Sequence, residues 1–194
     1  MTKRTILRLL PLLGALGACN MVISEKPMFD GHDRSTLIPR DGIWLAEVED
    51  CRFDSSKPEP VWPKCAVRAI VDNGGRQLQV SDGKGQSQRL AAIFTPGAPV
   101  IVQGQWVDQA KRPAKVFYGF FGLEAGAIGS DRRFGTATMW PVACGVQLGS
   151  GIRSFPGISA DCRPSSKRAI RAAATSSRGD ADAFKWRWLR AKSR

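Results

Sequence analysis

Hydrophobic and polar residues alternate in short runs over much of the chain after residue 42, and clusters of Gly, Pro, Asp and Asn separate the runs. Alternation with period two is typical of β-strands that have one face against a core. In the run 76–81, Leu78 and Val80 fall on one face while Gln77 and Gln79 fall on the other. We interpret the following runs as strands: 43–48, 65–72, 76–81, 89–95, 100–107, 116–123 and 136–142.

The spacing of these runs predicts an antiparallel fold. Strands that recur about every 8 to 12 residues, with no helix between them, are typical of sandwiches and barrels. The sequence Asp72-Asn73-Gly74-Gly75 predicts a hairpin turn, because Asn and Gly accept the positive φ angles of tight turns. We therefore expect a mainly β fold: a single antiparallel sandwich or barrel-like domain with one C-terminal helix followed by a final strand.

The C-terminal part supplies that helix and that strand. Residues 165–174 are rich in helix-forming side chains, and Ser165 is placed to cap the first turn. The segment 184–188 reads Phe-Lys-Trp-Arg-Trp. A strand here directs the three aromatic rings to the core and the two cations to water. The strict alternation favours this strand over an interfacial segment that presses its tryptophans into a membrane.

The run 116–122, Val-Phe-Tyr-Gly-Phe-Phe-Gly, is apolar at nearly every position. Apolar residues on both faces predict a strand that is buried on both sides. Its glycines leave open a groove that admits a ligand. We expect a core strand rather than a ligand pocket.

The first eighteen residues have the composition of a secretory signal. Lys3, Arg4 and Arg8 provide a basic start, an apolar stretch follows at 9–16, and small residues come next. The apolar stretch is shorter than the roughly 20 residues that a membrane-spanning helix needs. No later segment approaches that length, so we expect no transmembrane helix.

The sequence Leu16-Gly17-Ala18-Cys19 resembles the lipobox of bacterial lipoproteins. In that family the cysteine thiol receives a diacylglyceryl group, the signal is cut before the cysteine, and the new amino group is acylated. The resemblance implies that Cys19 is lipidated and begins the mature protein. Several acyl chains on one residue anchor firmly, because each buried methylene contributes about 0.8 kcal/mol. An ordinary signal peptide with an incidental cysteine is the alternative.

These features predict a location and a domain plan. Asn20 stands where inner-membrane retention in the lipoprotein family usually shows aspartate, which implies the outer membrane, facing the periplasm. Residues 20–40 show little periodicity, as expected of a tether. The plan is therefore a signal peptide at 1–18, a lipid-anchored tether at 19–40 and a β-rich globular domain at 41–194.

Four further cysteines, Cys51, Cys65, Cys144 and Cys162, predict two disulfides in an oxidising compartment. Three connectivities are possible. We favour Cys51 with Cys65 and Cys144 with Cys162, because each pair brackets a loop that contains Pro or Gly. Each bond would stabilise the fold by about 3 kcal/mol. A zinc ion held by four thiolates is a weaker alternative, because the chain has no Cys-x-x-Cys pair and one histidine.

Three local sequences together resemble a family of uncharacterised bacterial envelope lipoproteins. They are Gly-Ile-Trp at 42–44, the cysteine loop that contains Trp-Pro at 62–63, and Trp-Pro-Val-Ala-Cys at 140–144. The resemblance implies an envelope location and lends no activity.

The charge of the chain is concentrated at its C-terminal end. The formal net charge is +12, and the three basic residues of the leader leave +9 on the mature chain. Residues 160–194 contain ten Lys or Arg and three Asp. A basic face in the envelope would attract anionic lipid headgroups or other anionic polymers, whereas nucleic acid lies in another compartment. The candidate residues for such a face are Lys167, Arg168, Arg171, Lys185, Arg187 and Arg190. A solvated charged edge is the alternative.

No residue pattern predicts a catalytic site, a cofactor or a metal. His32 is the only histidine and lies in the expected tether, where a catalytic base would not be held rigidly. Asp30 and Asp33 beside it match metal ligands only by a spacing that is common by chance. Glu47 and Glu49 share one strand face instead of facing each other across a cleft. Residues 83–87 lack the full phosphate-loop pattern, so a hairpin turn explains them better.

Three functional hypotheses follow. The leading one is a non-catalytic, lipid-anchored envelope protein that works by binding or scaffolding. The second is a hydrolase or transferase that acts on envelope polymers with carboxylates or serine. The third is an accessory subunit of an outer-membrane assembly that docks on a protein partner through strand edges or aromatic residues.

Overall fold

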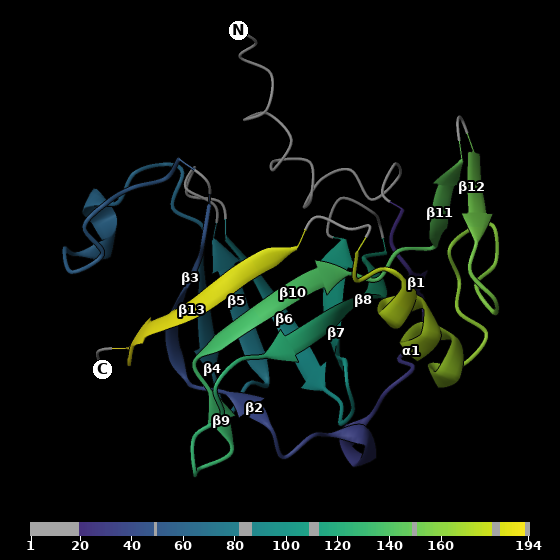
Figure 1. Cartoon of the computed structure of the whole chain (residues 1–194), viewed down its shortest axis with the longest axis horizontal. Coiled ribbons are helices and arrows are strands. Elements are labelled where there is room, and N and C mark those ends of the chain that lie inside the picture. The colour runs from purple at the N-terminus through teal and green to yellow at the C-terminus, as the bar shows by residue number, and fades with distance from the viewer. Residues whose placement is uncertain are drawn as a thin grey trace, which may run out of the picture.

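The fold is built around a closed antiparallel barrel (Figure 1). The computed structural model describes residues 20–48, 50–81, 87–108, 113–148, 151–179 and 183–192. Eight strands form the barrel in these residues: β3 (Gly42–Ala46), β4 (Arg68–Asp72), β5 (Gln77–Ser81), β6 (Ser87–Phe94), β7 (Val100–Asp108), β8 (Lys115–Ala125), β10 (Thr136–Pro141) and β13 (Phe184–Arg190). From β3 to β8 each strand pairs with the next one in the sequence. β10 then pairs with β8, and β13 closes the barrel between β10 and β3.

The predicted fold class is confirmed. Each barrel strand coincides with one of the alternating runs in the sequence, within a few residues at each end. The turn between β4 and β5 has positive φ angles at Asn73, Gly74 and Gly75, as its sequence predicts. The last strand exposes Lys185 and Arg187, while Trp186 and Trp188 pack against the core and Phe184 is half-buried, so the predicted alternation is confirmed.

The barrel interior forms one of two hydrophobic cores. Alternate residues of the strands meet inside it, among them Trp44 of β3 and Phe94 of β6. Phe134 comes from β9 (Arg133–Phe134), which pairs in parallel with β2 (Ile38–Pro39). The ring of Phe134 contacts Trp44 and Phe94 edge-on, with centroids 5.9 and 6.5 Å apart. The segments β2 and β9 therefore lie at one end of the barrel (Figure 1).

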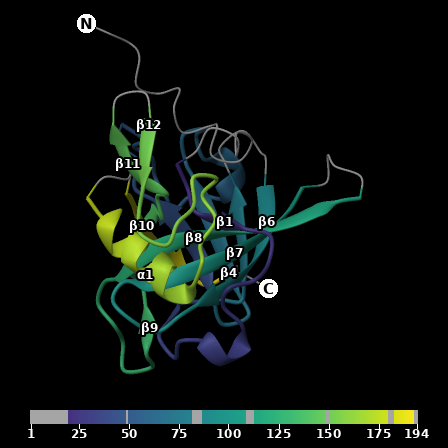
Figure 2. The same ribbon diagram turned by 90° about the vertical axis from the view of Figure 1, so that its right-hand side faces the viewer.

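The second core lies outside the barrel, against β7 and β8. The helix α1 (Lys167–Ser176) contributes the buried residues Ile170, Ala173 and Ala174 to it. They pack with Ile101 and Phe120, which point outward from β7 and β8. In Figure 2 the helix lies beside β8 and β10. Among the described residues, no helix is long and apolar enough to cross a membrane.

Residues 20–40 do not form the expected tether but pack on the barrel. The short strand β1 (Ile23–Ser24) pairs with β8, and Val22 and Phe29 are completely or almost completely buried in the outer core. The side chain of Gln103 bonds to the backbone of Phe29 through both its oxygen and its nitrogen. The segment bends at the 3₁₀ turn η2 (Gly31–Asp33). Its apolar residues follow these contacts and not a regular period, so the sequence pattern did not reveal their burial.

The helix α1 begins two residues later than predicted, and Ser166, not Ser165, caps it. The Ser166 hydroxyl accepts a hydrogen bond from the Ala169 N–H at 3.1 Å. Ser165 instead donates its backbone N–H to the carbonyl of Gly157. Two adjacent serines are equally suitable as caps, so the tertiary contact with Gly157 decides between them.

Both predicted disulfides are present. Cys51 and Cys65 have Cα atoms 5.7 Å apart and close the loop that contains the 3₁₀ turn η3 (Glu59–Val61). Cys144 and Cys162 have Cα atoms 5.1 Å apart, and Cys144 lies in the outer core. Between this second pair, the strands β11 (Gly145–Leu148) and β12 (Gly151–Ser154) form a separate two-stranded hairpin.

Trp140 of β10 joins the barrel wall to the helix. Its indole Nε1 donates to the carbonyl of Ala174 at 2.9 Å, and its ring lies directly over Gly122 of β8. A Cβ atom at residue 122 would overlap that ring. The glycine is therefore needed because the tryptophan occupies the space of its missing side chain.

We predict that Gly122→Ala lowers the free energy of unfolding by about 1–3 kcal/mol, because the new methyl group displaces Trp140 from a close-packed site. The matched control is Gly179→Ala, where a Cβ atom meets nothing within 4 Å. Denaturant unfolding of both variants measures the difference. Equal stabilities for the two variants would contradict the packing role of residue 122.

Candidate functional site

The barrel interior contains a cavity of about 70 Å³. Every residue that lines it is apolar: Pro39, Trp44, Ala69, Val71, Leu78, Val80, Phe94, Val102, Leu123, Phe134, Ala137, Met139 and Trp186. Most of these residues come from alternate positions of the barrel strands. An eight-stranded barrel is just wide enough for side chains to fill it or for one small ligand to enter.

The cavity exists because small residues lie among large ones in the same region of the barrel. Ala69 of β4 is paired with Trp44 of β3 on one side and with Val80 of β5 on the other. Ala137 of β10 is paired with Trp186 of β13 and with Ala125 of β8. The alanines leave space beside the rings that no described side chain fills. For comparison, an enclosed apolar cavity of about 150 Å³ stays dry and accepts benzene.

Trp186, one of the residues that line the cavity, contains a buried polar group without a partner. Its Nε1 atom is buried and has no hydrogen-bond partner in the described structure. The same holds for Nε of Arg40 among the described residues. Four other tryptophans donate this group to a backbone carbonyl: Trp44 to Arg40, Trp62 to Lys57, Trp140 to Ala174 and Trp188 to Asp41. A buried donor without a partner costs about 1–3 kcal/mol. The surface that the cavity presents is entirely apolar, so the oxygen of a ligand would reach this donor only if the Trp186 ring shifts.

The lining residues favour binding over chemistry. They supply no carboxylate, imidazole, thiol or hydroxyl that could transfer a proton or attack a substrate. Met139 is the most adaptable of them, because an unbranched thioether side chain repacks at low cost. The cavity can thus enlarge toward β10 for a ligand somewhat bigger than its resting volume.

The apolar run on β8 is a core strand, as predicted. Phe120 is buried in the outer core, whereas Phe121 packs against the inner one. The glycines of this run are covered by protein side chains: the Trp106 ring lies on Gly119 and the Trp140 ring on Gly122. The space that these glycines leave open therefore receives tryptophans, and the cavity lies elsewhere in the barrel.

Half of the predicted cationic residues are engaged within the fold. The Lys167 Nζ bonds to the carboxylate of Asp33 at 2.7 Å. The Arg171 guanidinium donates to the Pro96 carbonyl at 2.8 Å. The third engaged residue, Arg190, bonds to the Ser55 carbonyl at 3.1 Å and stacks over the ring of Trp62.

The other three cationic residues, Arg168 on α1 and Lys185 and Arg187 on β13, are exposed. The six residues therefore belong to two elements and serve different purposes. Lys167 and Arg171 on α1 contact the N-terminal segment at Asp33 and Phe29. Arg190 at the end of β13 helps to hold the Cys51–Cys65 loop in place.

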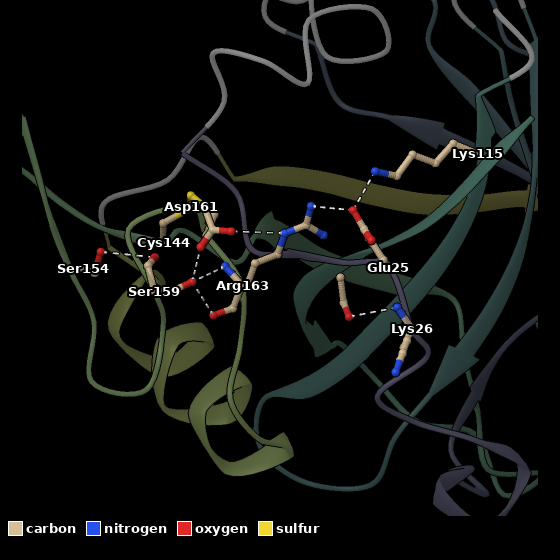
Figure 3. A network of polar contacts seen from close by, with 10 residues as sticks. Glu25, Lys26, Lys115, Cys144, Ser154, Ser159, Asp161 and Arg163 are labelled. Atoms are coloured by element: carbon tan, nitrogen blue, oxygen red, sulfur yellow. Dashed lines mark hydrogen bonds and ion pairs between the residues drawn. A yellow bond between two sulfur atoms is a disulfide. The ribbon is translucent and has the colours of Figure 1, made fainter. Parts of the chain in front are cut away.

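Several acidic residues are likewise paired with cations, and Glu25 and Asp161 share one of them. Glu25 accepts hydrogen bonds from Lys115 at 2.6 Å and from Arg163 at 3.1 Å, and Figure 3 shows Arg163 between Glu25 and Asp161. The bond from Lys115 is the main reason why the pKa of Glu25 lies below its usual value. This network connects the N-terminal segment to β8 and to the loop that precedes α1.

The candidate residues around His32 serve a structural role. Asp30 and Asp33 form the two halves of a capping box around η2, and the His32 N–H donates to Asp30 at 2.8 Å. Among the residues that the structure describes, no three His, Cys, Asp or Glu side chains form a metal-binding cluster. Glu47 is exposed at the end of β3, while Glu49 and residues 83–86 lie outside the described residues.

Comparison with protein-family models, with curated proteins and with solved structures gave no match to this chain. The geometry of the cavity and of the surface is therefore the basis on which a function can be assigned.

We predict that the Asp33–Lys167 pair stabilises the fold at neutral pH and not in acid. The hydrogen bond from Lys167 lowers the pKa of Asp33 in the folded protein. The stabilisation is therefore present above the unfolded-state pKa of about 3.9 and is lost as the pH falls through the lower folded-state value. Because the pair is partly exposed, its contribution is about 0.5 kcal/mol.

Urea unfolding of Asp33→Asn at pH 7 and at pH 2.5 measures this effect. The variant should lose less stability on acidification than the unmodified protein. Asp131→Asn, which removes an exposed aspartate that is not ion-paired, is the control. The same acid response in Asp33→Asn and the unmodified protein would contradict the role of the pair.

Proposed function

We propose that this chain is a lipid-anchored protein of the bacterial cell envelope whose barrel binds a small neutral apolar molecule without chemical change. The observation that carries the binding function is the apolar cavity whose wall includes Trp186, a residue with a buried and unpartnered indole N–H. The leader and the Leu16–Cys19 sequence support the anchor, although these residues lie outside the described ones. The two disulfides support export to an oxidising compartment.

The cavity wall limits the chemistry of the ligand. A charged group is disfavoured, because no lining residue compensates the cost of removing the charge from water. One donor matches one acceptor, so we expect a single carbonyl or ether oxygen on an otherwise hydrocarbon molecule. The volume is about half of the ~150 Å³ that accommodates benzene, so a small ring such as cyclopentane enters only if the Met139 side chain repacks.

The ligand can be tested with two probes of the same shape, cyclopentanone and cyclopentane. Each should raise the unfolding temperature of the purified protein, because a ligand that binds only the folded state stabilises it. We predict that Trp186→Phe weakens cyclopentanone binding about fivefold, since one neutral hydrogen bond contributes about 1 kcal/mol. The same substitution should leave cyclopentane binding within about twofold.

Trp62→Phe is the matched control for this experiment. Trp62 lies in the Cys51–Cys65 loop, outside the cavity, and its substitution should change neither affinity. The cavity would not be a binding site if neither probe stabilises the protein. The hydrogen-bonding role of Trp186 would be refuted if both probes lose affinity equally.

The anchor requires a separate test. In a Gram-negative host we expect the unmodified chain to remain with the membranes after an alkaline wash, and Cys19→Ala to be released, because the acyl chains provide the attachment. Mass spectrometry should show the acylated residue Cys19 at the new N-terminus. An unmodified N-terminus, or a soluble unmodified chain, would disprove lipid anchoring.

A further inference from the structure

The β11–β12 hairpin stands apart from the barrel. Its strands pair with each other as a separate sheet, from Gly145 opposite Ser154 to Leu148 opposite Gly151. In both views it projects away from the end of the molecule where β9 lies (Figures 1 and 2). An isolated two-stranded hairpin is at best marginally stable in water. The Cys144–Cys162 disulfide holds the base of this hairpin, whereas its outer part pairs with no other strand of the described structure.

The hairpin carries exposed aliphatic side chains near its tip. Leu148 is 52% exposed and Ile152 is 45% exposed. Leu148 is opposite Gly151, and Ile152 is opposite Gln147, so the two aliphatic residues point to opposite faces of the ribbon. From residue 142 to residue 152 the sequence contains no charged side chain, and the first cation is Arg153. Each face of the ribbon near the tip thus carries one aliphatic side chain, beside Gly151 on one face and Gln147 on the other, and no charge. An uncharged tip of this kind suits a medium that surrounds it.

The N-terminal end of the described chain is bound to the base of this hairpin. The Asn20 Oδ1 accepts hydrogen bonds from the N–H groups of Cys144 at 3.0 Å and Gly145 at 3.3 Å, and its Nδ2 donates to the Gly145 carbonyl at 2.9 Å. Two residues later, the Val22 N–H donates to the Val142 carbonyl at 2.7 Å. Asn20 is thus held in place by side-chain and backbone contacts. Cys19 precedes it by one residue, so their Cα atoms are about 3.8 Å apart.

We infer that the β11–β12 hairpin inserts its tip into the interfacial region of the bilayer that holds the lipid of Cys19. The inference rests on the proposed anchor, because the acyl chains bring that bilayer to the base of the hairpin. The occupant of this surface is the membrane itself. It solvates both faces of the tip at once, whereas a protein partner would cover the one face that it contacts.

The dimensions agree with an interfacial depth. Leu148 is three residues beyond Gly145 at the base, and a strand rises about 3.3 Å per residue, so the tip extends about 10 Å past Asn20. Interfacial segments bury their apolar face about 5–10 Å into the boundary between headgroups and acyl chains. Arg153, which is paired with Val146 nearer the base, would then lie at the level of the anionic headgroups. The insertion also orients the domain, with β9 directed away from the membrane.

Photo-crosslinking in isolated membranes tests the insertion on the full-length chain. A benzoylphenylalanine replaces Leu148 in one variant and Ile128 in the other. Ile128 is the matched control, because it is 56% exposed but bridges to Phe134 at the β9 end of the barrel. We expect position 148 to label phospholipid at least fivefold more strongly than position 128. In a second pair of measurements the probe replaces Ile152, and each chain also carries either Leu148→Asp or Ile128→Asp. Leu148→Asp should reduce lipid labelling at residue 152 several-fold, and Ile128→Asp should leave it unchanged.

The outcomes separate the insertion from the anchor. The protein could remain in the membrane fraction while residues 148 and 152 label no more lipid than residue 128. That result would overturn the insertion and leave the anchor intact. Labelling of a protein instead of lipid at residue 148 would also overturn it, since the hairpin would then contact a partner. Loss of the chain from the membrane fraction would overturn the anchor and the insertion together.

Discussion

The pairing of β13 with both β10 and β3 is the interaction on which the rest of the structure depends. It closes the sheet, so no barrel strand is left with a free edge along its whole length. Closure also separates an inside from an outside, and every alternating strand must then direct one set of residues into a confined space. The cavity, the two cores and the position of the helix are consequences of that separation.

The wall formed by β7, β8 and β10 has hydrophobic cores on both sides, and glycines make this possible. Gly119 and Gly122 leave space for the rings of Trp106 and Trp140, one inside the barrel and one outside it. The outward tryptophan reaches the helix through its bond to Ala174. Because the N-terminal segment packs into the same outer core, the residue that follows Cys19 is held at a defined place on the fold.

Charge and apolar surface have distinct roles in this protein. Glu25 and Asp33 are bound to cations that hold the N-terminal segment against the rest of the domain. The barrel cavity, by contrast, has an apolar wall. Among the described residues, the buried side-chain donors without a partner are Nε1 of the lining residue Trp186 and Nε of Arg40. This separation is in line with the proposal that the barrel binds an uncharged molecule. It gives less support to a hydrolase, which needs acids that converge on a substrate.

The sequence by itself determined which residues form the barrel strands, because period-two alternation and the turn at Asn73 are local properties. It also favoured the disulfide pairing that the structure shows, and it predicted that the two cations of β13 face outward. Tertiary structure alone decided the burial of Val22 and Phe29, since their partners are Gln103 and the outer core, distant in the sequence.

The cavity, too, was decided by the tertiary structure alone. Its volume depends on strand register, which places Ala69 beside Trp44 and Ala137 beside Trp186, and no local pattern specifies register across a closed sheet. The sequence directs the ring of Trp186 inward, but only the packed structure leaves its N–H without an acceptor.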